Sequence, residues 1–355
     1  MIPPGSTIGI LGGGQLGRMT ALAAAQLGYR SHVFCPETLS PAKLVTPFAT
    51  AARYDDAEAL AAFAAAVDVV TFEFENVPAA AADLLAGLKP VRPGPAILRI
   101  SQDRLAEKNF LRSIGVATTR FAAVRSAAEL ADACAAIGRP AVLKTVRLGY
   151  DGKGQVMIGA ATDLAAAWGA LGSELAILEG FVDFACEISV IVARGEDGTF
   201  AVYPPVENRH VHHILDTTIA PAPITAEAAA RAVAIARATA SALDLVGLLA
   251  VEMFVTKDGT LLVNELAPRP HNSGHWTLDA CVTSQFEQLV RAICGLKLGS
   301  PEPHSDAVMK NLIGADVARW QEFLADPRAK LHLYGKTETL PGRKMGHVTT
   351  LKPRG

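Results

Sequence analysis

Residues 246–266 read VGLLAVEMFVTKDGTLLVNEL, which is two apolar, β-prone runs on either side of a Lys-Asp-Gly tripeptide. An Asp-Gly dipeptide between two such runs is a strong signal for a hairpin with a two-residue turn. Counting outward from Asp258 and Gly259, this register places Glu252 directly opposite Glu265. The pattern therefore predicts a pair of carboxylates on one face of an antiparallel ladder.

Two glutamates at these positions would repel each other. Side chains that face each other across a ladder have Cβ atoms roughly 4.5–5.5 Å apart, and like charges there are destabilising. A divalent cation removes the conflict, and carboxylate oxygens suit magnesium. The alternatives are that one glutamate faces solvent, that a lysine neutralises it, or that the register is shifted by one residue. Asn264 points to the opposite face of a regular strand, so it joins the site only if the strand is irregular there.

The rest of the chain predicts a multidomain fold with α/β and α+β parts. Strand-like and helix-prone segments alternate in the N-terminal part, at 7–11, 18–27, 31–34, 57–66 and 67–72. This alternation is typical of a Rossmann-like parallel sheet. Further along we expect helices at 102–114 and 225–243 and strands at 140–145, 175–179 and 187–193. Proline clusters predict domain boundaries that give three domains, at 1–97, 98–298 and 299–355.

Composition and charge argue against several classes of function. The chain has 355 residues, of which 50% are hydrophobic and 19% charged, and its formal net charge is −2. Nucleic-acid binding needs a basic surface, which this balance does not supply. No apolar stretch is long enough for a membrane span, which takes roughly 18 residues or more, and we see no secretion signal. Five scattered cysteines without a CxxC pair are typical of reduced thiols, so we expect a cytoplasmic protein.

Two glycine-rich loops are candidate phosphate-binding elements. Gly12-x-Gly14-x-x-Gly17 has the dinucleotide-binding spacing, but the acidic residue expected after the second strand is replaced by Cys35-Pro36. NAD binding is therefore disfavoured. The helix N-terminal amides after this loop could still hold a phosphate or a small polar ligand, or the loop could be a tight turn without a ligand.

The second loop, GYDGKGQ at 149–155, follows the strand that carries Lys144. It lacks the Walker spacing. It is placed to act as a flap over a triphosphate, and the alternative is an ordinary strand connection.

Five motifs occur in order along nearly the whole chain: GILGGGQLGRM at 9–19, TFEFENVP at 71–78, GYDGKGQ at 149–155, NELAPRPHNSGHW at 264–276 and PGRKMGH at 341–347. Together they resemble the 5-(carboxyamino)imidazole ribonucleotide synthase family of the ATP-grasp superfamily. The resemblance implies an N-terminal α/β domain, a central ATP-grasp domain with a mobile lid, a small C-terminal domain and a cytoplasmic homodimer. It also implies a nucleotide held between two antiparallel sheets.

The resemblance further implies a role for each matching residue. ATP would be bound by Arg104, Lys144, Gly149, Tyr150, Asp151, Gly152, Lys153, Gly154, Gln155, Glu179, Gly180, Phe181, Val182, Glu187, His210, Asn264 and Glu265. Mg²⁺ would be bound by Glu252 and Glu265, which agrees with the hairpin argument. The aminoimidazole ribonucleotide would be bound by Gln15, Leu16, Glu73, Asn76, Lys336 and Arg343. Bicarbonate and the reacting intermediate would lie beside the catalytic set Tyr150, Arg269, His271 and Asn272.

Other conspicuous polar residues are interpreted without a ligand. Lys108 is expected to be a charge on a helix surface, and His275 and Trp276 are expected to be packing residues. His212 and His213 resemble a metal-binding pair, but adjacent residues on a strand point in opposite directions. Without the family, Lys336 and Arg343 would be interpreted as a solvated face, a further alternative.

The implied reaction is ATP-dependent carboxylation of 5-aminoimidazole ribonucleotide by bicarbonate through carboxyphosphate, giving ADP and phosphate. The nearest rival is a formate-dependent glycinamide ribonucleotide transformylase, another ATP-grasp ligase. That family has an acidic residue after Pro-Arg-Pro-His, where this chain has Asn272. An acid suits a cationic aliphatic amine, whereas an amide suits a neutral aromatic amine. A binding protein without catalysis is disfavoured because both carboxylates and Lys153 are retained.

Overall fold

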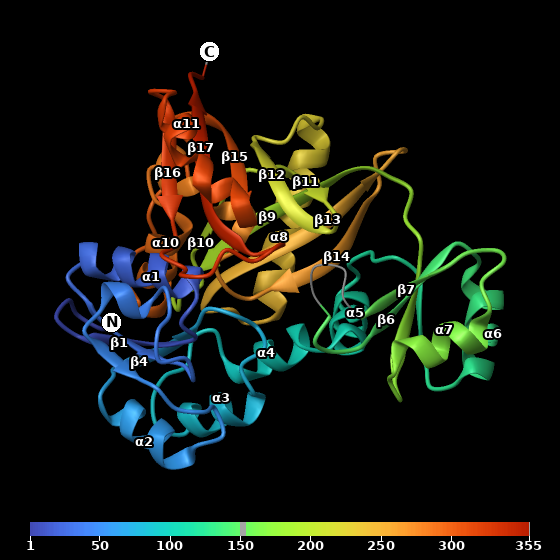
Figure 1. Cartoon of the computed structure of the whole chain (residues 1–355), viewed down its shortest axis with the longest axis horizontal. Helices are drawn as coiled ribbons and strands as arrows, with labels where there is room; N and C mark the ends of the chain where they lie inside the picture. The colour runs from blue at the N-terminus through green and yellow to red at the C-terminus, as the bar shows by residue number, and fades with distance from the viewer. Residues whose placement is uncertain (150–153, 355) are drawn as a thin grey trace.

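The N-terminal part of the computed structural model, which describes residues 1–149 and 154–354, is a parallel sheet with helices packed against it (Figure 1). Its strands are β1 (Thr7–Leu11), β2 (Arg30–Phe34), β3 (Phe48–Thr50) and β4 (Val69–Phe72), in the order β3-β2-β1-β4. Its helices are α1 (Gln15–Gln26), α2 (Ala57–Ala65), α3 (Ala79–Ala86) and α4 (Pro95–Ser101), with a 3₁₀ turn at Lys43–Val45. All three strand pairings are parallel, which confirms the predicted α/β sheet.

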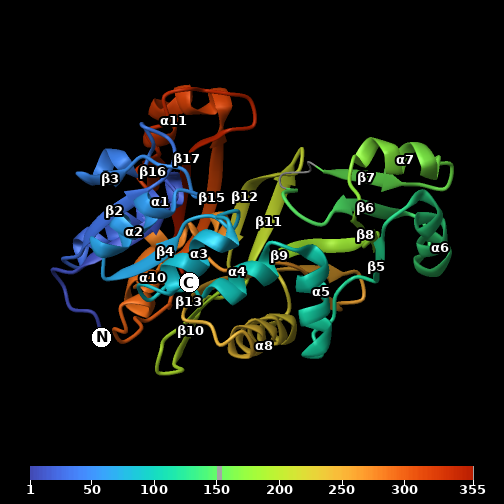
Figure 2. The ribbon, with the colours of Figure 1, turned by 90° about the horizontal axis from the view of Figure 1, so that it is seen from below.

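A second, antiparallel sheet projects to the far side of the molecule (Figure 2). Its order is β5-β8-β6-β7. The elements are β5 (Phe121–Val124), β6 (Ala141–Thr145), β7 (Gln155–Ile158) and β8 (Ala176–Gly180), with α6 (Ala127–Ile137) and α7 (Leu164–Leu171). The two helices bury a small separate core against the sheet. This unit, residues 121–180, is referred to below as the lid.

The largest sheet continues from the central part of the chain into its C-terminal part. Its order is β14-β13-β9-β11-β12-β15-β17-β16, with β10 paired to β9. The strands are β9 (Phe184–Arg194), β10 (Phe200–Val202), β11 (Val206–Val211), β12 (Ile214–Ala220), β13 (Gly247–Thr256), β14 (Leu261–Ala267), β15 (Asp306–Ile313), β16 (Ala329–Leu333) and β17 (Lys344–Lys352). The associated helices are α5 (Arg104–Ser113), α8 (Ala226–Ala242), α9 (Thr277–Ala280), α10 (Gln285–Ile293) and α11 (Trp320–Leu324), with 3₁₀ turns at Asn272–Gly274 and Gly314–Arg319.

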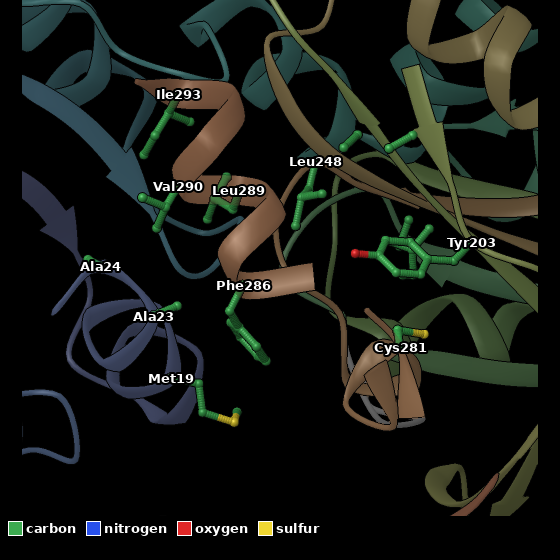
Figure 3. Packing of buried hydrophobic residues seen from close by; sticks show 14 of the residues in the cluster. Met19, Ala23, Ala24, Tyr203, Leu248, Cys281, Phe286, Leu289, Val290 and Ile293 are labelled. Atoms are coloured by element: carbon green, nitrogen blue, oxygen red, sulfur yellow. The ribbon is translucent and has the colours of Figure 1, made fainter. Parts of the chain in front are cut away.

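Helix α10 joins the N-terminal domain to the large sheet. Its residues Phe286, Leu289 and Ile293 are buried between α1, which contributes Met19, and the strand that carries Leu248 (Figure 3). Burying a side chain of this size contributes roughly 1.5–3 kcal/mol. This shared core fixes the end of the parallel sheet against the hairpin, so that one cavity can be lined by both. Along the described residues, no helix is long and apolar enough to cross a membrane.

Candidate active site

The β13–β14 hairpin pairs Glu252 with Glu265, as predicted, but by a different route. The loop has three residues, not two: the Gly259 N–H donates to the Thr256 carbonyl over 2.9 Å, and Gly259 has a φ of 82°. This loop shifts the register by one residue. A β-bulge at Asn264 shifts it back. The predicted two-residue turn is therefore wrong, and the predicted pairing is confirmed because the two offsets cancel.

Helix α5 holds the bulge in place. The Glu107 carboxylate accepts from the Leu266 N–H over 2.6 Å, and the Lys108 ammonium donates to the Asn264 carbonyl over 2.7 Å. Lys108 is 1% exposed and lies 3.5 Å from the Glu179 carboxylate. The prediction that Lys108 is a surface charge is therefore wrong. The Val263 and Asn264 carbonyls, together with Glu179, satisfy its charge.

A cavity of about 590 Å³ lies where the N-terminal domain, the large sheet and the lid meet. Most of the predicted site residues line it. They are Gln15, Leu16, Glu73, Asn76, Arg104, Lys144, Gly149, Gln155, Glu187, His210, Glu252, Asn264, Glu265, Arg269, His271 and Asn272. The structure thus brings together residues that are about 250 positions apart in the sequence.

The remaining predicted residues that the structure describes do not line this cavity. Gly180, Phe181 and Val182 line a neighbouring cavity of about 510 Å³. The residues that line neither cavity are Gly154, Glu179, Lys336 and Arg343. The flap residues Tyr150, Asp151, Gly152 and Lys153 lie outside the described residues.

The paired carboxylates differ in their partners. His271 Nε2 lies 2.8 Å from Glu252, and although burial acts to raise the pKa of this carboxyl, His271 holds it below its usual value. Glu265 has no hydrogen bond or ion pair to any residue in 1–149 or 154–354. Glu265 is exposed, as the alternative of a solvent-facing glutamate had it, but the protein around it, and then the charge on Glu252, still raise its pKa. Two carboxylates with one side chain unpaired fit a bound cation.

Asn272 also lacks partners. Both polar atoms of its side chain are buried and, within the described part of the chain, form no hydrogen bond. Buried polar groups in proteins are nearly always bonded. Because Asn272 lines the cavity, its unpaired amide indicates a polar ligand there.

Three ion pairs shape the walls of the cavity. Lys144 donates to Glu179 over 2.5 Å, and His210 Nδ1 lies 2.5 Å from Glu187. The third pair joins Arg269 to Glu75. Burial acts to raise the pKa of Glu75, but the charge of the guanidinium lowers it to about 2.

Glu75 is a site residue that the sequence reasoning missed. It lies within the TFEFENVP motif, so the signal was present, but nothing in the sequence indicated that it would pair with Arg269. The other residues that line the cavity without having been predicted are Phe74, His213, Leu215, Phe254 and Lys344.

The first glycine loop is occupied by the chain itself. The Glu73 carboxylate accepts from the Gly14 N–H and, over 2.7 Å, from the Gly17 N–H. A Cβ at Gly12 would lie 2.4 Å from the Glu73 side chain. The amides that were expected to be open to a phosphate or small ligand therefore already hold an anion, and the glycines are needed for its close approach.

Lys336 lies close to the same loop. It donates to the Lys344 carbonyl over 2.6 Å, and burial, followed by the charge of Arg343, lowers its pKa to about 8. Glu73 acts in the opposite direction. Lys336 is therefore a partly buried cation beside the loop, which argues against the alternative of a freely solvated face.

The histidine predictions have mixed outcomes. His212 and His213 lie in the turn between β11 and β12 with positive φ values, not on a strand, so the argument from opposite faces does not apply. His213 lines the cavity. His275 and Trp276 are buried, as predicted for packing residues.

Three known domain families match the chain in sequence order. They are the ribonucleotide synthetase preATP-grasp domain at residues 5–102, the ATP-grasp domain at 109–286 and the phosphoribosylaminoimidazole carboxylase C-terminal domain at 307–354.

Characterised relatives match along the whole length. The N5-carboxyaminoimidazole ribonucleotide synthase of Brucella melitensis is 51% identical over 355 residues, which cover 99% of this chain and 98% of that protein. The crystal structure of such a synthetase in complex with ADP has a TM-score of 0.96 at 44% identity and covers 100% of this chain and 94% of its own. The Aspergillus clavatus synthase with ADP and 5-aminoimidazole ribonucleotide has a TM-score of 0.91 at 31% identity, covering 98% and 94%. The chain therefore belongs to the N5-carboxyaminoimidazole ribonucleotide synthase family of ATP-grasp ligases.

Proposed function

We propose that the protein uses ATP to carboxylate the amine of 5-aminoimidazole ribonucleotide with bicarbonate, releasing ADP and phosphate. The observation that carries this proposal is the juxtaposition, in one cavity, of the Glu252–Glu265 pair with the unpaired amide of Asn272. The carboxylates suit a nucleotide with its divalent cation, and the amide suits a small polar reactant beside it. The family relationship supplies the identity of the substrates.

ATP is proposed to lie along the cavity wall formed by the lid and the hairpin. Lys144 and Arg104 supply positive charge for the phosphates, and Glu187 supplies an acceptor for ribose hydroxyls. Mg²⁺ would be held by Glu252 and Glu265, where it would neutralise charge on the transferred phosphoryl group. Gly180, Phe181 and Val182 line the adjoining cavity, so adenine recognition there is proposed to involve their backbone.

Bicarbonate is a poor electrophile because the negative charge delocalised over its oxygens donates electron density to the carbon. Phosphorylation converts it to carboxyphosphate, whose phosphate is a good leaving group, and the amine of the ribonucleotide then attacks the carboxyl carbon. Asn272 offers a donor and an acceptor, which suits the O⁻ and O–H of bicarbonate. Arg269, oriented by Glu75, stabilises charge on the transferred oxygens.

The ribonucleotide phosphate is proposed to bind at Lys336 and Arg343, beside the loop that carries Gln15 and Leu16. Charge-assisted hydrogen bonds from two cations would hold a dianion there. Replacement of Arg343 by Gln is expected to raise KM for the ribonucleotide far more than KM for ATP. Equal increases in both would contradict this assignment.

The decisive assay is ADP release from ATP and 5-aminoimidazole ribonucleotide, with and without bicarbonate. We expect release to depend on bicarbonate and on the ribonucleotide together. The formyl-transfer alternative predicts ADP release with formate and glycinamide ribonucleotide instead, and that result would overturn the proposal. A homodimeric, cytoplasmic enzyme is the further expectation from the family, and sedimentation analysis of the purified chain tests the dimer.

A further inference from the structure

A chain of buried hydrogen bonds leads away from the cavity behind His271. The Asn208 amide nitrogen lies 3.0 Å from Ser189 Oγ, which lies 2.6 Å from Ser273 Oγ. Ser273 Oγ in turn lies 2.8 Å from His271 Nδ1. Ser189 and Ser273 are fully buried and Asn208 is 4% exposed. Burying such polar groups is costly unless each finds a partner, so the chain needs an explanation that ordinary packing does not give.

The hydrogen bonds from Asn208 to His271 all donate in the same direction, toward His271. The Asn208 amide nitrogen can only donate, so its proton goes to Ser189. Ser189 then donates its single hydroxyl proton to Ser273, and the Ser273 hydroxyl is left to donate to His271. Thr218 Oγ1, which lies 3.2 Å from Asn208 Oδ1, orients the amide at the far end.

The other contacts of His271 require the same direction. The Ser273 backbone N–H points at His271 Nδ1 over 3.4 Å, which makes this nitrogen an acceptor a second time. A neutral ring that accepts at Nδ1 carries its proton on Nε2, which faces the Glu252 carboxylate at 2.8 Å. A carboxylate at that position needs a hydrogen-bond donor, so the contacts of Nδ1 and those of Nε2 favour the same tautomer, with the proton on Nε2.

We propose that Ser273, Ser189 and Asn208 are positioning residues that fix His271 with its Nε2–H directed at Glu252, and thereby orient this carboxylate for a divalent cation. His271 then acts as a hydrogen-bond donor to a metal-binding side chain, as outer partners of metal ligands commonly do. This inference rests on the metal site of the proposed function, because Glu252 needs orienting only if it binds a cation.

The first test reads the ring directly in the metal-free protein. Nitrogen-15 NMR of histidine-labelled protein, with His271→Asn to identify the signals, is expected to show Nε2–H and an Nδ1 that accepts hydrogen bonds. Ser273→Ala is expected to shift the Nδ1 signal toward that of an unbonded nitrogen, and Ser189→Ala to shift it less. A ring protonated at Nδ1 in the wild type would overturn the proposal.

The second test measures metal affinity without turnover, as Mn²⁺ binding in the presence of ADP followed by electron paramagnetic resonance. Ser273→Ala is expected to weaken binding about tenfold and Ser189→Ala about threefold. Ser31→Ala is the matched control. Its hydroxyl is also buried but has no partner in the described part of the chain, so no change is expected. If Ser273→Ala and Ser189→Ala weaken Mn²⁺ binding no more than Ser31→Ala does, the proposal is overturned.

Glu252→Gln separates the two levels of inference. If it weakens Mn²⁺ binding while both serine variants match Ser31→Ala, the chain has no positioning role and the metal site stands. If Glu252→Gln itself leaves Mn²⁺ binding unchanged, the metal site fails, and the positioning proposal fails with it. Thermal unfolding of each variant checks that altered binding does not follow from partial unfolding.

Discussion

Glu73 and Glu265 line the same cavity, yet their surroundings are opposite. Glu73 accepts hydrogen bonds from the Gly14 and Gly17 amides at the start of α1. Glu265 has no such partner among the described residues, and it faces the like charge of Glu252 across the hairpin. Glu73 is buried whereas Glu265 is exposed, yet the protein that surrounds each of them raises the pKa of both carboxyls. What marks a ligand site here is charge that the chain leaves uncompensated.

The largest expected effect comes from removing the uncompensated charge. Glu265→Gln is expected to lower bicarbonate-dependent ADP release on the order of 10²–10³-fold, because a cation ligand is lost from the transferred phosphoryl group. The same change should stabilise the metal-free protein by up to about 1 kcal/mol, since it removes repulsion from Glu252. ADP release and urea unfolding measure the two effects. Near-normal turnover would contradict the metal assignment.

Replacing Lys108 tests whether its buried contacts hold Glu252 and Glu265 in register. Lys108→Met leaves the Asn264 carbonyl without its donor and removes one of the two lysines around Glu179. We expect a loss of about 3 kcal/mol in the free energy of unfolding, as for other buried ion pairs that lose one partner. Lys257→Met, in the exposed loop of the same hairpin and paired with Asp183, is the control and should cost under about 1 kcal/mol. Equal losses in the two variants would mean that the buried contacts of Lys108 contribute no more to stability than an exposed ion pair does.

Glu73→Gln tests the carboxylate whose charge the loop N–H groups already compensate. The amide group of glutamine has one acceptor oxygen, so one of the two loop N–H groups would face an NH₂ group. The expected cost is about 1–3 kcal/mol of unfolding free energy, opposite in sign to the effect of Glu265→Gln. Urea unfolding without ligands compares the two variants directly. A stabilised Glu73→Gln protein would remove the contrast between the two sites.

The sequence predicted the site best where local geometry decides contacts. Alternation of strands and helices was enough for the parallel sheet, and a turn dipeptide was enough to predict the β13–β14 hairpin. The pairing of Glu252 with Glu265 nevertheless depended on a bulge at Asn264 that cancels an error in the turn. The bulge is held by Glu107 and Lys108 from a separate helix, and no periodicity within residues 246–266 could reveal it.

The sequence could not predict which residues, far apart along the chain, neutralise each other's charge. The glycine spacing left open a phosphate, a small polar ligand or a turn without a ligand at the start of α1, whereas the group that binds these amides is Glu73, which follows a strand about 60 residues later. Lys108 was assigned to the surface because its acceptors lie on β14. Glu75 was missed because its partner, Arg269, lies in the ATP-grasp domain, 194 residues further along the chain.

The smallest expected effect concerns Lys336, whose pKa is lowered to about 8 by burial and then by the charge of Arg343. A phosphate-binding lysine must be protonated, so it is fully competent well below pH 8 and loses its charge as the pH rises through that value. KM for the ribonucleotide should therefore climb by up to tenfold per pH unit above about pH 8, while KM for ATP serves as the internal reference. Lys336→Arg keeps its charge throughout this range, so its KM should stay flat even if its baseline is higher. An identical rise in the arginine variant would assign the pH dependence to another group and leave Lys336 without a role in phosphate binding.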